Sequence, residues 1–308
     1  MIEFHQISKK FGENTVVRDL NLTVTRGEFC VLIGSSGSGK STILKMINRL
    51  VEHDTGEIRF AGEEIRTFRP EVLRRRIGYA IQSVGLFPHW TVEANIATVP
   101  RLLGWAPDRI DARIAELLHL LNLDAARYRK AFPHQLSGGQ QQRVGVARAL
   151  AADPDVLLMD EPFGALDPIT RDSLQSEMTR IHAETGKTIV FVTHDMDEAL
   201  RLASRVVILD KGHIVQAASP RDLLNAPAND FVREFLGKDD YGLKLLSVET
   251  VAKRMRRSIE ADGEGSVLPD DNLRLALSRM VALKTDRIAV CNALGARIGT
   301  LFLADVVT

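Results

Sequence analysis

The sequence has few cysteines and no excess of charge of either sign. Cys30 and Cys291 are the two cysteines among 308 residues, and each lies in an apolar, strand-like run. Isolated cysteines of this kind favour buried, reduced thiols over a disulfide. Forty Lys and Arg balance forty Asp and Glu, so no global basic field points to nucleic acid as the main partner.

Long apolar runs are also absent. The longest, such as VLLM and RVVILD, are far shorter than the roughly 20 residues that span a bilayer. The first residues, MIEFHQISKKFGE, carry charges where a secretory signal would be apolar. We therefore expect a cytosolic chain with one large and one small domain, and any membrane role would require a separate chain.

Continuous apolar strands are the first positive signal. FCVLIG, DVLLMD (155–160) and TIVFVT (188–193) are each bounded by turn or helix signals. Runs of this type are typical of a parallel sheet buried on both faces. Residues 1–30 instead alternate polar and apolar around turns, which predicts an antiparallel edge sheet. The fold class is therefore α/β, with a mixed sheet core.

Helical periodicity dominates residues 91–150. One apolar stripe of the segment DRIDARIAELLHLLNL comprises Ile110, Ile114, Leu117, Leu118 and Leu121. We expect a helical subdomain at about 83–150, within a first domain of residues 1–236. Further on, RVVILDKGHIVQ predicts a hairpin that turns on Lys211 and Gly212.

Residues 237–308 predict a small α+β domain after a charged connector, KDD. The segment contains a basic, helix-like run, VAKRMRRSIE, and a second helix pattern, NLRLALSRMVAL. Two short strands, RIAVC and RIGTLFL, follow and are joined by NALGA. The basic run contains Lys253, Arg254, Arg256 and Arg257. It is either a solvated helix face or a sensor of ionic strength that touches anionic lipid head groups.

A phosphate-binding loop is the strongest motif. GSSGSGKST satisfies G-x-x-x-x-G-K-[ST] between a predicted strand and a predicted helix. Its backbone N–H groups and the helix N-terminus attract phosphate oxygens, Lys40 reaches the β and γ phosphates, and the Ser41 hydroxyl binds Mg²⁺. The predicted nucleotide-binding residues are Gly34, Ser35, Ser36, Gly37, Ser38, Gly39, Lys40, Ser41 and Thr42. ATP and Mg²⁺ are the expected cofactors.

Two acidic residues and a histidine follow the later strands. Asp160 ends VLLMD and can hold Mg²⁺, while the adjacent Glu161 can polarise an attacking water. Strand alternation lets the two carboxylates point to different sides. His194 ends TIVFVTH, at the sheet edge where open α/β sheets bind ligands. The other histidines are scattered, so we expect no zinc site.

A second glycine turn, LSGGQ at 136–140, begins another predicted helix. Ser137 can cap this helix and direct its N–H groups toward an anion. With LSGGQ between the phosphate loop and VLLMDEP, residues 1–236 resemble the ATP-binding subunits of ABC transporters. The resemblance implies a P-loop ABC-type ATPase domain and a head-to-tail homodimer. In that dimer one subunit contacts the γ-phosphate of the ATP bound to its partner through Ser137, Gly138 and Gly139, and Gln140 also belongs to the predicted nucleotide-binding residues.

The resemblance also implies roles for single residues. Phe11 matches the aromatic position that stacks on adenine, and Gln82 the glutamine that senses Mg²⁺ and the attacking water. Asp167 matches a loop that crosses the dimer interface. Glu161 would act as general base, with His194 positioning the γ-phosphate and water. The apolar residues that would receive a coupling helix of a transmembrane permease are Leu86, Phe87 and Trp90.

Two segments resemble the osmoprotectant, or quaternary-amine, uptake branch of this family. They are GYAIQSVGLFPHWTV and the C-terminal DRIAVCNALGARIGTLFLADVV, which is similar to a single or truncated CBS module. We expect an ATPase subunit at the cytoplasmic face of the membrane, bound to permease subunits and served indirectly by an extracytoplasmic solute-binding protein. Glycine betaine, carnitine or choline would be the cargo. Alternatives are an importer ATPase for an amino acid or other small polar solute, and a soluble non-transport ABC ATPase.

Overall fold

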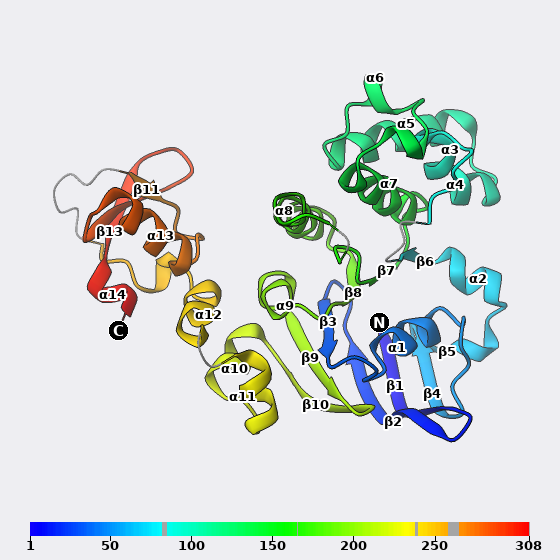
Figure 1. Cartoon of the computed structure of the whole chain (residues 1–308). Coiled ribbons are helices and arrows are strands. Elements are labelled where there is room, and N and C mark those ends of the chain that lie inside the picture. Colours follow the sequence, from blue (N-terminus) through cyan, green and yellow to red (C-terminus); the bar gives the residue numbers. More distant parts are fainter. Residues whose placement is uncertain (82–84, 165, 238–239, 258–264, 308) are drawn as a thin grey trace. The chain divides into compact units, whose positions relative to one another are not determined.

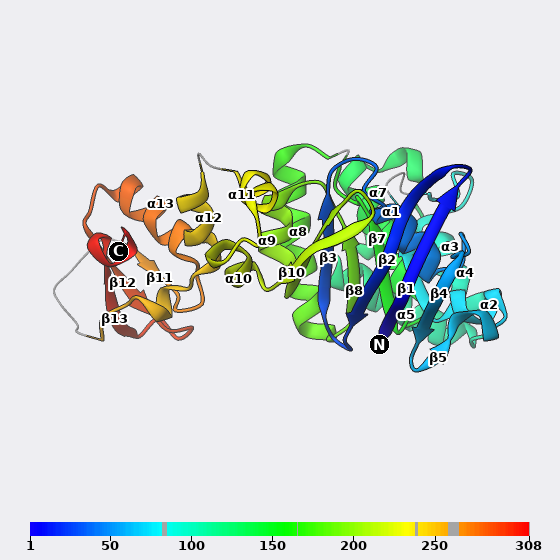
Figure 2. The same ribbon diagram turned by 90° about the horizontal axis from the view of Figure 1, so that it is seen from below.

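The computed structural model describes residues 1–81, 85–164, 166–237, 240–257 and 265–307 (Figures 1 and 2). Contacts within the chain divide it into two compact units, Met1–Ala217 and Ala218–Thr308. Each unit is described by itself. The domain boundary that the sequence predicts between residues 236 and 237 stays a prediction.

A six-stranded sheet forms the centre of the first unit, in the order β10-β9-β3-β8-β7-β6. Its strands are β3 (Phe29–Gly34), β6 (Ile77–Ala80), β7 (Val156–Asp160), β8 (Thr188–Val192), β9 (Arg205–Asp210) and β10 (His213–Ala218). Strands β6, β7, β8, β3 and β9 pair in parallel. Every residue of β3 and β8 is buried, which confirms the prediction from the apolar runs.

The parallel register brings the carboxyl ends of three strands to one edge. Asp160 of β7 pairs with Val192 of β8, and Val192 pairs with Leu32 of β3. The segments that follow these strands therefore meet at the same edge, as the sequence predicts. They are the phosphate loop, Glu161 and His194.

A separate four-stranded sheet has the order β2-β1-β4-β5. Its strands are β1 (Ile2–Phe11), β2 (Asn14–Val24), β4 (Thr55–Phe60) and β5 (Glu63–Glu64). All printed pairs are antiparallel, as the alternation in residues 1–30 predicts. The buried side chains of this sheet join one core with Leu32 of β3 and Ile43 of the following helix.

The first unit also contains helices, several of which are labelled in Figure 1. They are α1 (Lys40–Ile47), α2 (Pro70–Arg75), α3 (Val92–Ile96), α4 (Thr98–Leu102), α5 (Pro107–Leu120), α6 (Ala125–Tyr128), α7 (Gly138–Leu150), α8 (Pro168–Thr185) and α9 (Met196–Leu202), with short 3₁₀ turns at Ile65–Thr67 and Pro133–Gln135. The stripe predicted for α5 is buried at all five positions. The run of helices from α3 to α7 lies in the segment for which the sequence predicts a helical region.

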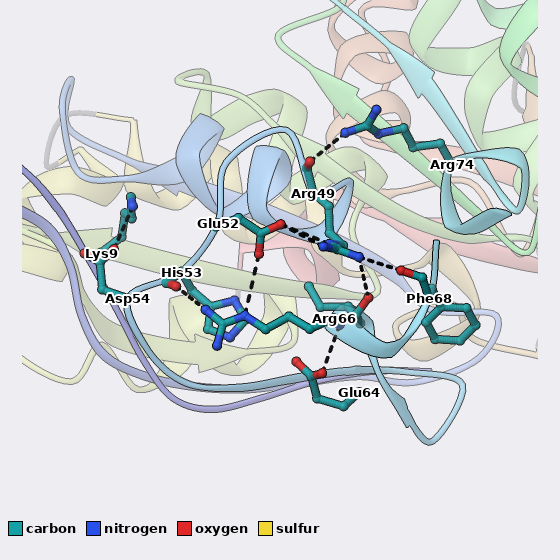
Figure 3. Close-up of polar contacts among 10 residues, drawn as sticks. Lys9, Arg49, Glu52, His53, Asp54, Glu64, Arg66, Phe68 and Arg74 are labelled. Atoms are coloured by element: carbon teal, nitrogen blue, oxygen red, sulfur yellow. Dashed lines mark hydrogen bonds and ion pairs between the residues drawn. The ribbon is translucent and has the colours of Figure 1, made fainter. Parts of the chain in front are cut away.

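Polar contacts tie the end of α1 to its surroundings, as Figure 3 shows. Arg74 donates hydrogen bonds to the carbonyl oxygens of Asn48, at 3.1 Å, and Arg49, at 2.7 Å. Arg49 in turn pairs with Glu52 at 3.0 Å. Arg74 thus satisfies carbonyls just after α1, where positive charge is favourable, while the Arg49 side chain donates to the carbonyl oxygens of Ile65 and Phe68.

Two smaller expectations have different outcomes. The hairpin turn is confirmed, because Lys211 and Gly212 adopt φ angles of 46° and 84° between β9 and β10. Both cysteines are free, but only Cys30 is buried, while Cys291 at the end of β12 (Arg287–Cys291) is partly exposed. Burial raises the pKa of the Cys30 thiol to about 12. The prediction of burial is therefore wrong for Cys291, because the strand that carries it ends at the surface.

The second unit contains a three-stranded sheet in the order β11-β12-β13. Its elements are α10 (Pro220–Asn225), α11 (Asp230–Leu236), α12 (Tyr241–Val248), a 3₁₀ turn at Val251–Lys253, β11 (Ser266–Val267), α13 (Leu273–Leu283), β12 (Arg287–Cys291), β13 (Arg297–Phe302) and α14 (Leu303–Val307). Strands β12 and β13 pair antiparallel. This agrees with the strand-turn-strand-helix pattern expected from the sequence.

The expected helix in the basic run is wrong. After the 3₁₀ turn, Arg256 forms a bridge with Thr300 of β13, with backbone hydrogen bonds of 2.8 and 2.9 Å in the two directions. The Arg256 guanidinium also makes two hydrogen bonds to Asp305, and Arg254 pairs with Glu249 at 3.1 Å. The pairing with β13 replaces the helix, and two of the four cations are engaged within the unit. Ser258, Ile259 and Glu260, which end the run, lie outside the described residues.

Candidate active site

The phosphate loop connects β3 to α1 through glycines that pack against backbone. Gly34 has a φ of 158°, and a Cβ there would lie 2.0 Å from the Leu209 carbonyl oxygen. Gly39 has a φ of 101°, and a Cβ would lie 2.8 Å from the Val16 carbonyl oxygen. Because neither backbone neighbour can move aside cheaply, both positions require glycine.

Lys40 lies at the start of α1 and is 7% exposed. Its Nζ donates hydrogen bonds to the carbonyl oxygens of Gly34, at 2.8 Å, and Ser35, at 2.9 Å. Burial lowers the pKa of this ammonium, while Glu161 and Asp160 act in the opposite direction. A ligand with negative oxygens would therefore replace neutral carbonyls with a stronger partner.

The first turn of α1 has no hydrogen bond from an N-cap side chain, because its N-cap is Gly39. Its N–H groups are therefore left to a ligand, as in other anion sites at helix N-termini. Ser38 adds a second sign of this, because its buried hydroxyl oxygen has no hydrogen-bond partner among the described residues. These features fit a nucleotide phosphate.

Asp160 and Ser41 meet across the loop. The Ser41 hydroxyl donates to Asp160 Oδ1 at 2.8 Å. Burial raises the pKa of Asp160, and the hydrogen bond from Ser41 acts against this shift. Among the described residues, no group of three or more His, Cys, Asp and Glu could hold a metal. One carboxylate, one hydroxyl and phosphate oxygens nevertheless suit Mg²⁺, which commonly binds through substrate phosphates.

Glu161 faces a different partner from Asp160. Its Oε2 lies 3.1 Å from Nδ1 of His194, whereas Asp160 accepts from Ser41, so the two carboxylates have separate hydrogen-bond partners. The strand ends at Asp160 and Glu161 has a φ of 45°. The separation thus comes from the backbone turn at Glu161 as well as from the strand alternation that the sequence predicts.

A cavity of about 410 Å³ brings together most of the predicted phosphate-binding residues and two predicted catalytic residues, whereas Gly34, Ser35, Ser38 and Asp160 are not part of its lining. It is lined by Val16, Ser36, Gly37, Gly39, Lys40, Ser41, Thr42, Glu161 and His194. Val16, from β2, was not predicted. No local motif marks this valine, because it reaches the cavity only through the packing of the antiparallel sheet against the loop.

The Ser-Gly-Gly turn has a different local structure from the phosphate loop. Ser137 is the N-cap of α7, and its hydroxyl oxygen accepts from the Gln140 N–H at 3.3 Å. Gln140 Oε1 accepts from the Ser137 N–H at 2.9 Å, so the two residues form a capping box. The predicted cap is confirmed. None of the four residues 137–140 lines the 410 Å³ cavity of the same chain.

The other predicted residues lie apart from this cavity or cannot be described. Phe11 ends β1 with half of its surface exposed, and the Lys9 ammonium lies 5.3 Å from its ring centroid. Asp167 caps α8 by accepting from the Thr170 N–H at 3.1 Å. Gln82, expected to sense Mg²⁺ and water, lies outside the described residues.

An exposed aromatic pair precedes α3. Phe87 and Trp90 are 44% and 43% exposed, and their ring centroids are 4.5 Å apart, whereas Leu86 is half-buried. The fully buried Asn95 fixes this loop with hydrogen bonds to the backbone of Phe87, Trp90 and Thr91. The aromatic rings thus lie on an ordered surface.

Comparisons with known proteins agree with this geometry. Residues 17–164 match the family model described as "ABC transporter". The chain is 61% identical over 306 residues to the glycine betaine uptake system ATP-binding protein YehX of Escherichia coli K12, covering 99% of each chain. It is 48% identical to the glycine betaine/carnitine/choline transport ATP-binding protein OpuCA of Bacillus subtilis 168, covering 94% of this chain and 75% of that protein.

A solved structure supports the same assignment. The dimeric post-hydrolysis state of the ATP-binding cassette MJ0796, bound to ADP and Pi, has a TM-score of 0.63 and 33% sequence identity, covering 71% of this chain and 98% of that one. In the described ranges, no helix is both long and apolar enough to cross a membrane. The predicted ABC-type ATPase fold is thus confirmed, and the chain belongs to the family of ABC transporter ATP-binding proteins.

Proposed function

We propose that this chain is the ATP-binding and ATP-hydrolysing subunit of an importer for an osmoprotectant such as glycine betaine, carnitine or choline. The observation that carries the cargo assignment is the 61% identity, over nearly the whole of both chains, to a glycine betaine uptake ATP-binding protein. ATP hydrolysis is supported by the cavity that joins Lys40 to Glu161 and His194.

In this function the phosphate loop binds the triphosphate of ATP. The N–H groups at the start of α1 contact phosphate oxygens, and Lys40 exchanges its two carbonyl partners for the β and γ phosphates. Ser41 and Asp160 are the described residues that would hold Mg²⁺, with Gln82 as a third predicted ligand. The metal would neutralise charge that develops on the phosphates.

Glu161 acts as the general base. Its carboxylate takes a proton from water as the water oxygen bonds to the γ-phosphorus and the bond to the β-phosphate oxygen breaks. His194 lies on the cavity wall within hydrogen-bond distance of Glu161. It therefore orients the carboxylate and holds the γ-phosphate while the charge moves.

A second copy of the chain completes the site. The Ser137 hydroxyl oxygen already accepts from Gln140 N, so its proton stays free to be donated to an anion. Because residues 137–140 lie outside the cavity of their own chain, we infer that they reach the γ-phosphate bound to the partner in a head-to-tail homodimer. Phe11 would stack on adenine, and Asp167 would cross the interface.

The remaining partners follow from the same assignment. Phe87 and Trp90 would receive the coupling helix of a transmembrane permease, which suits their exposed and ordered rings. An extracytoplasmic solute-binding protein would deliver cargo to the permease without touching this chain. The subunit would act at the cytoplasmic face of the membrane. Residues 1–236 would form the ATPase domain, and residues 237–308 a single CBS-like domain.

Replacement of Glu161 by Gln tests the proposal. The amide keeps the shape of the carboxylate but cannot accept a proton, so we expect ATP binding to persist, turnover to fall by about 100-fold or more, and the ATP-bound dimer to accumulate. The measurements are ATPase rate and size-exclusion chromatography. Wild-type chain reconstituted with its permease and binding protein should drive uptake of labelled glycine betaine.

Two outcomes would contradict this assignment. Near-normal hydrolysis by Glu161→Gln would remove Glu161 from the role of base. Uptake of an amino acid in place of any quaternary amine would leave the ATPase intact but change the cargo. Glu184→Gln is the matched control, because Glu184 is an exposed carboxylate at the far end of α8 that pairs with Arg180, and it should leave both activities unchanged.

A further inference from the structure

A buried carboxylate lies behind the strand end that carries His194. Glu198, on α9, is 5% exposed. Its Oε2 accepts from the Thr193 hydroxyl at 2.6 Å, and its Oε1 accepts from Gln175 Nε2 at 3.1 Å. Burial raises the pKa of Glu198, and the hydrogen bond from Thr193 opposes that shift. Such a group is costly to bury unless both of its oxygens have partners, as they do here.

The first partner fixes the segment around His194. Thr193 directly precedes His194, and its N–H donates to the Leu32 carbonyl of β3 at 3.2 Å. Its hydroxyl oxygen also accepts from the Asp195 N–H at 3.0 Å. Asp195 then caps α9 by accepting from the Glu198 N–H at 3.1 Å. Both residues that flank His194 are thus tied to the helix that carries Glu198.

The second partner leads to another element of the site. Gln175 lies on α8, and its Oε1 accepts from Arg201 of α9 at 3.0 Å. The N-cap of α8 is Asp167, the residue expected at the dimer interface. Helices α8 and α9, both labelled in Figure 1, therefore meet through Glu198, Gln175 and Arg201.

We propose that Glu198 is a positioning residue for hydrolysis. By holding Thr193 with one oxygen and Gln175 with the other, it sets the place of His194 relative to Glu161 and connects that place to α8 and the loop at Asp167. The proposal rests on the proposed function, because it concerns the same reaction. Glu198 does not line the cavity, so it acts through its neighbours and does not touch the nucleotide.

The test uses the full chain and steady-state ATPase measurements on Glu198→Gln, Thr193→Val and Thr193→Ser. A misplaced catalytic group lowers kcat more than it weakens substrate binding. We expect Glu198→Gln and Thr193→Val each to lower kcat by about 10-fold, with KM for ATP changed by less than about 2-fold. Thr193→Ser keeps the hydroxyl and should therefore retain most of kcat.

The double variant separates positioning from general destabilisation. If Thr193 and Glu198 act as one contact, Thr193→Val with Glu198→Gln should be no slower than the slower single variant. The control is Asp172→Asn, which removes an exposed α8 partner of Arg201 and should keep wild-type kcat. If Glu198→Gln does not fold, the comparison of Thr193→Val with Thr193→Ser still tests whether the hydroxyl bonded to Glu198 is needed for hydrolysis.

Several kinetic results would contradict the proposed role of Glu198. Multiplicative losses in the double variant, or equal losses for Thr193→Ser and Thr193→Val, would contradict the proposal. So would a lowered thermal midpoint with normal kcat at a temperature where the variants remain folded. A wild-type chain without ATPase activity would instead overturn the proposed function. Wild-type hydrolysis with unaffected Glu198→Gln and Thr193→Val would overturn only the role of Glu198.

Discussion

The phosphate loop and the Ser-Gly-Gly turn both place glycines at a helix N-terminus, but they treat the first N–H groups differently. At α1 the N-cap is Gly39 and no cap side chain bonds to the helix, so the N–H groups are left to a ligand. At α7, Ser137 and Gln140 satisfy each other. The first turn would bind the phosphates of its own chain's ATP, whereas the second is already capped and would meet the ATP of a partner chain. Two glycine-rich helix starts can therefore differ in how many of their first N–H groups are already bonded within the chain.

The phosphate loop gives the prediction with the strongest effect. Lys40→Ala removes the buried ammonium that would pair with the β and γ phosphates, so we expect ATP affinity to fall by about 100-fold or more. Isothermal titration calorimetry with ATP measures this. Lys45→Ala is the matched control, because Lys45 is an exposed lysine on the same helix and should keep wild-type affinity. Equal losses for the two variants would contradict the special place of Lys40.

At the Ser-Gly-Gly turn we expect a loss of turnover and not of ATP binding. Ser137→Ala removes a hydroxyl donor that we place on the partner's γ-phosphate, so kcat should fall by about 100-fold, while ATP affinity of the monomer stays within about 2-fold. The matched control is Ser219→Ala, since Ser219 caps α10 in the same way and should leave kcat unchanged. If Ser137→Ala weakened ATP binding to the monomer as much as Lys40→Ala, the two turns would share one role and the comparison would fail.

A third prediction concerns the C-terminal ends of α1 and α7, and its effect is on stability. Arginines bond to the last carbonyls of both α1 and α7, but α1 is followed by the buried His53. Burial lowers the pKa of His53 below 6.5, and Arg66 adds to the shift while Glu64 and Glu52 oppose it. As pH falls through about 6.5, the unfolded chain binds a proton that the folded chain does not, so stability falls.

We therefore expect His53→Gln to lose less stability than wild type between pH 7.5 and 5.5, by about 1 kcal/mol. Chemical denaturation at the two pH values measures this difference. His89→Gln, which replaces an exposed histidine, should follow wild type. An identical pH dependence for His53→Gln and wild type would show that His53 does not contribute.

The central sheet and the separate predicted site residues were visible in the sequence because their signals are local. The phosphate loop, VLLMD and TIVFVTH each carry the full motif within a few residues, and parallel strands bring their carboxyl ends together. Glu198 could not be assigned in this way. Its partners, Thr193 and Gln175, lie on different elements, and its own position within a short helix looks like any surface carboxylate.

The basic run failed as a helix for a related reason. Its local composition favours a helix, but the backbone of Arg256 pairs with Thr300, 44 positions further along the chain. Propensity is a weak guide when tertiary contacts compete. A meeting of LSGGQ with the nucleotide of a partner chain is likewise expected only from the family resemblance, because no spacing within one chain indicates which cavity a turn faces.

The capping box at Ser137 and Gln140 bears on the rate at which two chains would close around ATP. Side chains that are already fixed by hydrogen bonds lose little conformational entropy when they meet a ligand. When two chains close on an ATP molecule, the Ser-Gly-Gly turn would thus dock in a conformation that it already has. The rate of closure would then depend on encounter and orientation of the two chains, and not on the folding of this turn around the nucleotide.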